Sequence, residues 1–282
     1  MPSVLLSVLW LFAWGHGSAS SDWPAWRGPI GTGEAREGNP PIEFSETVNL
    51  AWKTAIPGAG ASTPIIWGDT IYLQTSTPIG PEKAPAQQKF AFGENQNVYH
   101  GQTYTRATRD HEFAMVAMNR RTGAIKWTKV LHTEQPTEGR HPTNTYASGS
   151  PSTDGQRLIA FFGSRGLFAL NMQGDVLWSR DFGQMDTRNG WGEGSSPTLF
   201  RNRVIVTWDH EGASFIAALD AASGREVWRR ERREPTTWAT PLVVAVGNRV
   251  QVITNGQQHV RAYDFDSGAD IWHGPGLTFN SI

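Results

Sequence analysis

The stretch IAALDAASGREVWRR, residues 216–230, decides the fold of this chain. It contains a short apolar run, an Asp, a Ser-Gly turn and a lone Trp. The same order of residues occurs in three further stretches: VAMNRRTGAIKWTK (116–129), FALNMQGDVLWSR (168–180) and RAYDFDSGADIWHG (261–274). The last Trp of each copy recurs at intervals of 44 to 51 residues: Trp127, Trp178, Trp228 and Trp272. A fixed period of this length indicates an architecture of stacked, similar units.

A second anchor lies upstream of each Trp, where Ser or Thr precedes a proline. These prolines are Pro64, Pro151, Pro197 and Pro241. Each is followed by a turn and a run rich in β-branched residues, such as VIVTW or VQVIT. One unit therefore predicts four short strands in about 45 residues, and none shows the spacing of an amphipathic helix. The sequence predicts an all-β fold, a β-propeller of four-stranded blades.

Both the Trp and the turn residues of the repeat have a physical explanation. A Trp at a fixed point on the last strand can lay its flat ring against the next blade, and a small Ala leaves room for it. A Gly can adopt the positive φ that a tight turn needs, while Asp or Asn bonds nearby backbone N–H groups. The expected turn glycines are Gly123, Gly174, Gly224 and Gly268.

ALDAASGREVW closely resembles the pyrroloquinoline quinone (PQQ) enzyme repeat, which reads Ala-x-Asp-x-x-(Thr/Ser)-Gly-x-x-x-Trp. The likeness covers roughly residues 45–274, and DWPAWRGPIGTG (22–33) resembles the leader of secreted PQQ-like propellers. Asn119 and Asn171 replace the Asp in two copies, and the second copy is one residue shorter in its turn. Both departures keep turn chemistry.

The resemblance implies a ring of seven or eight blades, of which this sequence supplies about four. Trp52, in LAWKT, resembles the final strand of a further blade with nothing before it. We therefore expect the chain to be the N-terminal part of a longer protein that is monomeric at full length, with a complete four-bladed ring as the alternative. Residues 21–282 are expected to be propeller, with a polar insertion at about 76–113 between the second and third strands of the first blade.

Residues 1–20 read as a signal peptide. VLLSVLWLFAW (4–14) is apolar but too short to cross a bilayer, and small residues follow it. The chain has no Cys, which excludes disulfides, thiolate chemistry and a lipid attached to Cys. We expect a periplasmic or secreted protein with no stable membrane anchor. A formal charge of −1 argues against nucleic acid as a partner.

Ligands of such propellers usually bind where the chain crosses between blades, at one mouth of the central channel. The crossing loops should end just before each anchor proline. The most polar of these loops is 181–196. The side chains of the crossing loops that suit a polar site are Asn144, Tyr146, Arg188, Asn189, Trp191, Glu193 and Trp238. Trp191 or Trp238 could stack on a ligand, Arg188 could bind an anion, and Glu193 and Asn189 could offer oxygens to a hard cation. The alternative is that these side chains satisfy loop backbone and fill blade interfaces.

Two functions follow from the resemblance. The first is an exported, non-catalytic binding or scaffold module whose partner is a protein, a small polar ligand or a carbohydrate. The second is a quinoprotein dehydrogenase of alcohols or sugars, with PQQ and calcium as cofactors. The sequence has neither the adjacent cysteines of many such enzymes nor a haem-attachment motif. No residue matches the enzyme's catalytic or metal-binding motif, so none is assigned either role, and the binding module is favoured.

Overall fold

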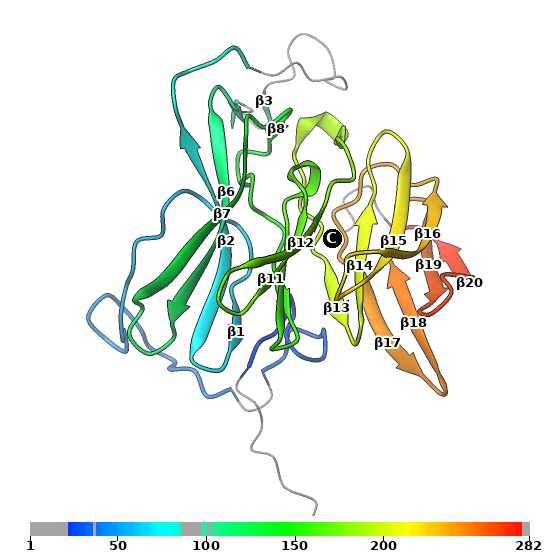
Figure 1. Cartoon of the computed structure of the whole chain (residues 1–282), viewed down its shortest axis with the longest axis horizontal. Coiled ribbons are helices and arrows are strands. Elements are labelled where there is room, and N and C mark those ends of the chain that lie inside the picture. The colour runs from blue at the N-terminus through cyan, green and yellow to red at the C-terminus, as the bar shows by residue number, and fades with distance from the viewer. Residues whose placement is uncertain (1–21, 36–37, 86–97, 100–101, 104, 278–282) are drawn as a thin grey trace, which may run out of the picture.

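The computed structural model describes residues 22–35, 38–85, 98–99, 102–103 and 105–277. The expected signal peptide and the middle of the expected insertion lie outside these residues. The described part is built from four antiparallel sheets of four strands, arranged as a fan (Figure 1). This confirms the expected fold, successive blades of a β-propeller.

Each blade is a simple meander whose strands pair in chain order. The first blade contains β1 (Ile65–Trp67), β2 (Thr70–Ile79), β6 (Asp110–Asn119) and β7 (Ile125–Glu134). The second contains β9 (Ser152–Thr153), β10 (Arg157–Phe161), β11 (Leu167–Asn171) and β12 (Val176–Arg180). The third contains β13 (Thr198–Phe200), β14 (Arg203–Trp208), β15 (Ser214–Asp220) and β16 (Glu226–Arg232). The fourth contains β17 (Leu242–Val246), β18 (Arg249–Thr254), β19 (His259–Asp264) and β20 (Asp270–Pro275).

The remaining elements are short. A small hairpin joins β3 (Val98–Tyr99) to β4 (Gln102–Thr103), and β5 (Thr105–Arg106) pairs with β8 (Gly139–Arg140). Two 3₁₀ turns, η1 (Gly163–Arg165) and η2 (Arg188–Gly190), lie in the second blade and in the loop after it. Among the described residues, no helix has the length and apolarity needed to cross a bilayer.

The segment inserted in the first blade is narrower than the sequence suggests. β2 continues to Ile79 and β6 begins at Asp110, and the two strands pair over their whole length. The interruption therefore runs between those two residues rather than over 76–113. The ends of β2 and β6 carry polar side chains, so the hydrophobic pattern ends before the strands do. The backbone hydrogen bonds between the two strands continue beyond that pattern.

The core lies between the blades as well as within them. One apolar cluster joins Leu158, Ala160 and Leu170 of the second blade to Met115 of the first. Another joins the opposite face of the second blade, at Ile159, to Val206 in the third. Alternate residues of one strand thus face opposite neighbours, so each blade buries both faces only when it is stacked.

The repeated Trp forms the outer part of each interface. Trp178 lies against the turn at Gly224, and its indole N–H donates to the carbonyl oxygen of Ala221 at 3.0 Å. Trp228 does the same at Gly268, donating to Phe265 at 2.9 Å. Each Trp is paired across the strands with the Ala of its own repeat: Ala117 with Trp127, Ala169 with Trp178, Ala218 with Trp228 and Ala262 with Trp272.

Trp52 takes the same place on the first blade. It lies against Gly123 and donates to the carbonyl oxygen of Arg120 at 3.0 Å, although it is not part of a strand. Thr54, two residues further on, donates to the carbonyl oxygen of Gly123. Arg180 and Arg230, each two residues after its Trp, donate to Gly224 and Gly268 in the same way. The turn glycine is therefore covered by a ring and held through its carbonyl group.

The Ser or Thr before each anchor proline links the blades along the inner rim. The N–H of Thr63 donates to the Ser150 hydroxyl, and the N–H of Ser150 donates to the Ser196 hydroxyl, both at 2.9 Å. The N–H of Ser196 donates to the Thr240 hydroxyl at 3.3 Å. Each hydroxyl thus accepts from the corresponding residue of the blade before it. This explains why the anchor needs a hydroxyl and not merely a small residue.

Candidate functional site

The inner rim borders a cavity of about 380 Å³, where the chain crosses from blade to blade. We call it the mouth cavity. Its aromatic lining residues are Trp26, Trp191 and Trp238, and its polar ones include His141, Thr143 and Asn144. The inner-rim residues Thr63, Ser150, Ser196 and Thr240 also border it. Three of the seven expected site residues therefore lie together here: Asn144, Trp191 and Trp238.

The two expected tryptophans form a stacked pair. Their ring centroids lie 5.9 Å apart at an interplanar angle of 26°. The Trp238 indole N–H donates to the carbonyl oxygen of Gly192 at 2.7 Å, which fixes its ring against the 181–196 loop. The His141 ring meets Trp191 edge-on, at 5.4 Å. The pair thus gives the mouth cavity a rigid aromatic wall.

The polar groups of the mouth cavity are neutral. Burial lowers the pKa of His141, so its imidazole is uncharged at neutral pH. Its Nδ1 lies 2.8 Å from the Thr143 hydroxyl, and its carbonyl oxygen accepts the N–H of Asn144. The Asn144 side-chain oxygen accepts from the Thr145 N–H and from the Ser148 hydroxyl. Among the described residues, no Asp, Glu, Lys or Arg lines this cavity.

Three expected site residues lie elsewhere in the crossing loops. Arg188 donates from its guanidinium to Gln257 at 3.2 Å, and its N–H donates to the Thr236 hydroxyl. Asn189 adopts a left-handed backbone with φ of 57°. Arg188 and Asn189 belong to η2 and do not line the mouth cavity. Tyr146 packs edge-on against His111, and burial raises the pKa of its phenol to about 12.

Glu193 lies in the protein interior. Its carboxylate accepts bonds from the Ser164 backbone N–H, at 2.6 Å, and from the Ser164 hydroxyl. Glu138 lies nearby and accepts two bonds from Thr187. Burial, reinforced by the charge of Glu193, raises the pKa of Glu138 to about 8. Both carboxyl groups border a narrow cavity of about 40 Å³ that also reaches Trp238. Through these contacts Glu193 ties the 181–196 loop to η1 of the second blade.

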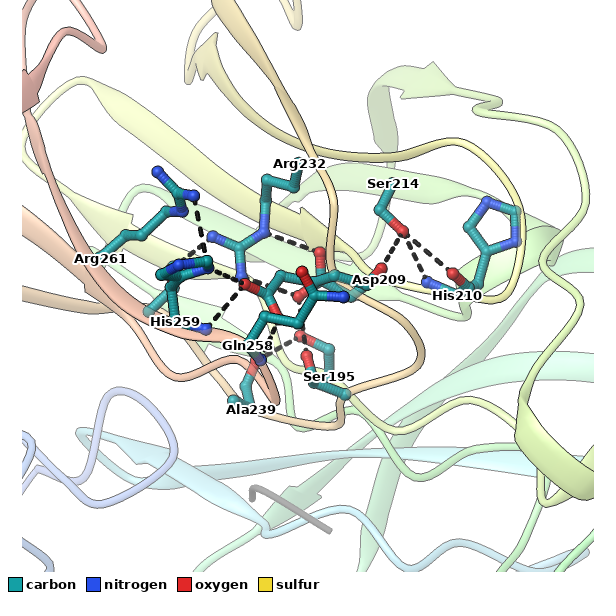
Figure 2. Close-up of polar contacts among 12 residues, drawn as sticks. Ser195, Asp209, His210, Ser214, Arg232, Ala239, Gln258, His259 and Arg261 are labelled. Carbon is teal, nitrogen blue, oxygen red and sulfur yellow. Dashed lines mark hydrogen bonds and ion pairs between the residues drawn. The ribbon is translucent and has the colours of Figure 1, made fainter. Parts of the chain in front are cut away.

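A buried ion pair fixes the loop that carries Trp238. Figure 2 shows the Arg232 guanidinium beside Asp209, with N–O distances of 2.7 and 2.9 Å and both side chains fully buried. Arg232 also donates to the hydroxyls of Thr254 and Tyr263, and Thr237 donates to Asp209. The pair therefore joins the third blade to the fourth directly beneath the crossing loop.

His210 and Glu211 follow Asp209 and contact the 181–196 loop. The Asp186 N–H donates to His210 Nδ1 at 3.1 Å, and the Glu211 N–H donates to the Asp186 carbonyl oxygen. The sequence did not single out Trp26, Glu138 or the Asp209–Arg232 pair as a unit. The density of Trp in DWPAWRGP was a usable signal for Trp26.

The four-stranded blades and the repeated contacts of Trp, Ala and Gly are those of a PQQ-like repeat propeller. A family model described as outer membrane protein assembly factor BamB matches residues 42–192 and 181–280, and the chain belongs to this family. This confirms the resemblance seen in the repeat. No curated protein matches the chain by sequence.

Solved propeller structures match it at low identity. Quinohemoprotein alcohol dehydrogenase ADHIIG from Pseudomonas putida HK5 has 12% identity and a TM-score of 0.45, over 82% of this chain and 36% of that one. BamB from Moraxella catarrhalis has 13% identity and a TM-score of 0.41, over 73% and 68%. A europium-containing methanol dehydrogenase has 12% identity and a TM-score of 0.49, over 82% and 44%. The chain thus spans less than half the length of the two dehydrogenases.

The residues at the mouth do not fit PQQ with a calcium ion. PQQ carries several carboxylates, and the mouth cavity offers them no cationic side chain among the described residues. Trp191 and Trp238 cover one face of each other, and the Glu193 carboxylate is turned inward to Ser164. The described residues hold no cluster of three or more His, Asp or Glu arranged for a metal ion.

Proposed function

We propose that the chain is an exported, non-catalytic binding module whose ligand site is the mouth cavity. The neutral lining of this cavity carries the proposal. Its volume of about 380 Å³ falls in the size range of ligand pockets, and it combines indole rings with a few amide, imidazole and hydroxyl groups. Such a lining can bind and orient a ligand.

The described lining of the mouth cavity holds a single titratable side chain, which favours binding over acid–base catalysis. Acid–base chemistry requires a titratable group placed to exchange a proton near neutral pH. Among the described residues, His141 is the one titratable side chain that lines the mouth cavity, and its Nδ1 is engaged by the Thr143 hydroxyl. The buried carboxyl groups of Glu138 and Glu193 are engaged by Thr187 and Ser164. The description of the family as an assembly factor also supports a binding role.

A ligand screen with a matched variant tests this proposal. The full chain would be panned against a phage-displayed random peptide library and a glycan array, and each hit measured again on Trp191→Ala. We expect at least one ligand whose affinity falls about tenfold or more, since buried aromatic residues are common binding hot spots. Trp272→Ala removes a Trp outside the mouth cavity and should leave the affinity unchanged.

The opposing result is equally concrete. Titration with PQQ and calcium chloride, followed by dye reduction with ethanol or glucose, would establish the dehydrogenase if both binding and turnover occur. A screen without any hit that depends on Trp191 would also overturn the proposal.

Export is tested separately, by fusing alkaline phosphatase after residue 20. Activity outside the cytoplasm is expected, and its absence would remove export from the proposal.

A further inference from the structure

Residues 22–33, here called the strap, run along the inner ends of the blades. The Asp22 carboxylate accepts the Gly68 N–H at 2.7 Å, and Trp23 exchanges two backbone bonds with Ile66 in β1. The carbonyl oxygen of Pro24 accepts the N–H of Thr153 in the second blade at 2.8 Å. The strap is therefore attached to two blades before it reaches Trp26.

The conformation of the strap is defined on both sides of Trp26. Gly28 has φ of 75°, and a Cβ there would lie 2.8 Å from the ring of Trp23, so the chain must turn tightly over that ring. The Arg27 guanidinium lies 4.3 Å from the centre of the Trp26 ring and covers one of its faces. The carbonyl oxygen of Arg27 accepts the Gly33 N–H. Trp26 is thus held in one orientation.

Trp26 lies at the boundary of two cavities. It lines the mouth cavity together with Trp191 and Trp238, and it also lines a second cavity of about 260 Å³. The second cavity lies between the strap and the third and fourth blades, and Arg27 lines it. Since Arg27 is absent from the lining of the mouth cavity, the charge is on the other side of the Trp26 ring. The face of the Trp26 indole that borders the mouth cavity is therefore the one not covered by the Arg27 guanidinium, and it is uncharged.

The chemistry of the mouth cavity selects among small ligands. An anion or cation would lose its hydration without gaining a charged partner, which is costly. A purely apolar ligand would make no use of the Asn144, His141 and Thr143 side chains, which keep bonding capacity beyond the contacts that they make with Thr145, Ser148 and each other. A sugar ring has apolar C–H faces that pack on indole and hydroxyl groups that bond to amides and imidazoles.

We propose that the mouth cavity binds a neutral saccharide and that Trp26 of the strap is a ligand-contacting residue. The inference rests on the proposed binding function and specifies the ligand. A sugar ring packs between Trp26 and the Trp191–Trp238 pair, and its hydroxyls bond to Asn144, His141 and Thr143. The strap is thereby part of the binding site.

Calorimetric titration of the full chain with cellobiose, maltose and N,N′-diacetylchitobiose tests the inference. We expect at least one of them to bind, Trp26→Ala to weaken its affinity by about tenfold or more, and Trp26→Phe to retain most of it. Trp272→Ala is the matched control and should bind as the parent does. In the parent protein, the bound sugar should also protect Trp26 from oxidation by N-bromosuccinimide, read by mass spectrometry. This readout is independent of the folding of any variant.

Three results would overturn the inference in different ways. If none of the three sugars binds while a peptide from the library binds through Trp191, the ligand class is wrong and the binding function stands. If a sugar binds equally to Trp26→Ala and leaves Trp26 open to oxidation, the strap is not part of the site. If neither sugars nor library ligands bind, the proposed function itself fails.

Discussion

Trp228 and Trp272 occupy the same position of the repeat but different surroundings. Trp228 is 6% exposed and lies on the Gly268 turn of the fourth blade, whereas Trp272 is 41% exposed. The Trp272 indole donates to Gln251 of its own blade. Each pairs with the Ala of its own repeat, so the two tryptophans have the same cross-strand partner within their own sheets. The difference shows that this Trp stabilises the fold through the following blade.

Replacing the two tryptophans is the strongest test of this comparison. Trp228→Ala should lower the free energy of unfolding by about 3–5 kcal/mol, because it opens a cavity in a packed interface. Trp272→Ala should cost less than about 1 kcal/mol, since a half-exposed side chain loses little burial. Urea denaturation of both variants measures the two values. Similar losses for both would contradict the idea that the next blade supplies the stabilisation.

The turn under Trp228 gives a second test, of intermediate size. A Cβ on Gly268 would lie 2.5 Å from the Trp228 ring, and the backbone has φ of 68°. Gly268→Ala should therefore cost about 2–4 kcal/mol, from backbone strain and overpacking together. Gly247 has φ of 60° with nothing near its Cβ position, so Gly247→Ala isolates the backbone part, about 1–2 kcal/mol. Equal melting temperatures of the two variants would show that the ring contact contributes nothing.

The inner rim is expected to give a smaller effect than the contacts of Trp228 and Gly268. Ser196→Ala removes the hydroxyl that accepts the Ser150 N–H, and leaves that buried group without its acceptor. The expected loss is about 1–2 kcal/mol, below that of Trp228→Ala. Ser196→Thr keeps a hydroxyl, as Thr240 does at the same place in the next blade, and serves as the control. A loss as large as that of Trp228→Ala would mean that the inner rim holds the blades together as firmly as the tryptophans do.

The repeat made most of the fold predictable, because each blade packs against the next one through the same residue types. Trp, Ala, Gly and the anchor hydroxyl recur in sequence since their contacts recur in space. Trp52 illustrates the limit of this reasoning. The sequence suggested a strand, but the structure keeps the ring on Gly123 without placing Trp52 in a sheet. The docking contact is set by the side chain, whereas strand formation also needs a neighbouring strand.

The mouth was less predictable, because its residues do not recur. Loop membership grouped Asn144, Trp191 and Trp238 as candidates, and the structure brings these three to one cavity. It could not separate them from Glu193, which differs only in the direction of its side chain toward Ser164. Nor could loop membership find Trp26, which reaches the cavity from a segment outside the repeat.

The strap also has a consequence for the order of folding. Trp23 and Pro24 bond to the first two blades, while Gly31 lies beside Leu242 in the fourth. Some of the earliest residues of the described chain therefore contact a strand near its end, and the loop that this contact closes spans all the blades in between. Contacts of such high sequence separation carry the largest closure entropy and form late. We therefore expect the contact of Gly31 with the fourth blade to form late, after Trp23 and Pro24 have attached the strap to the first two blades.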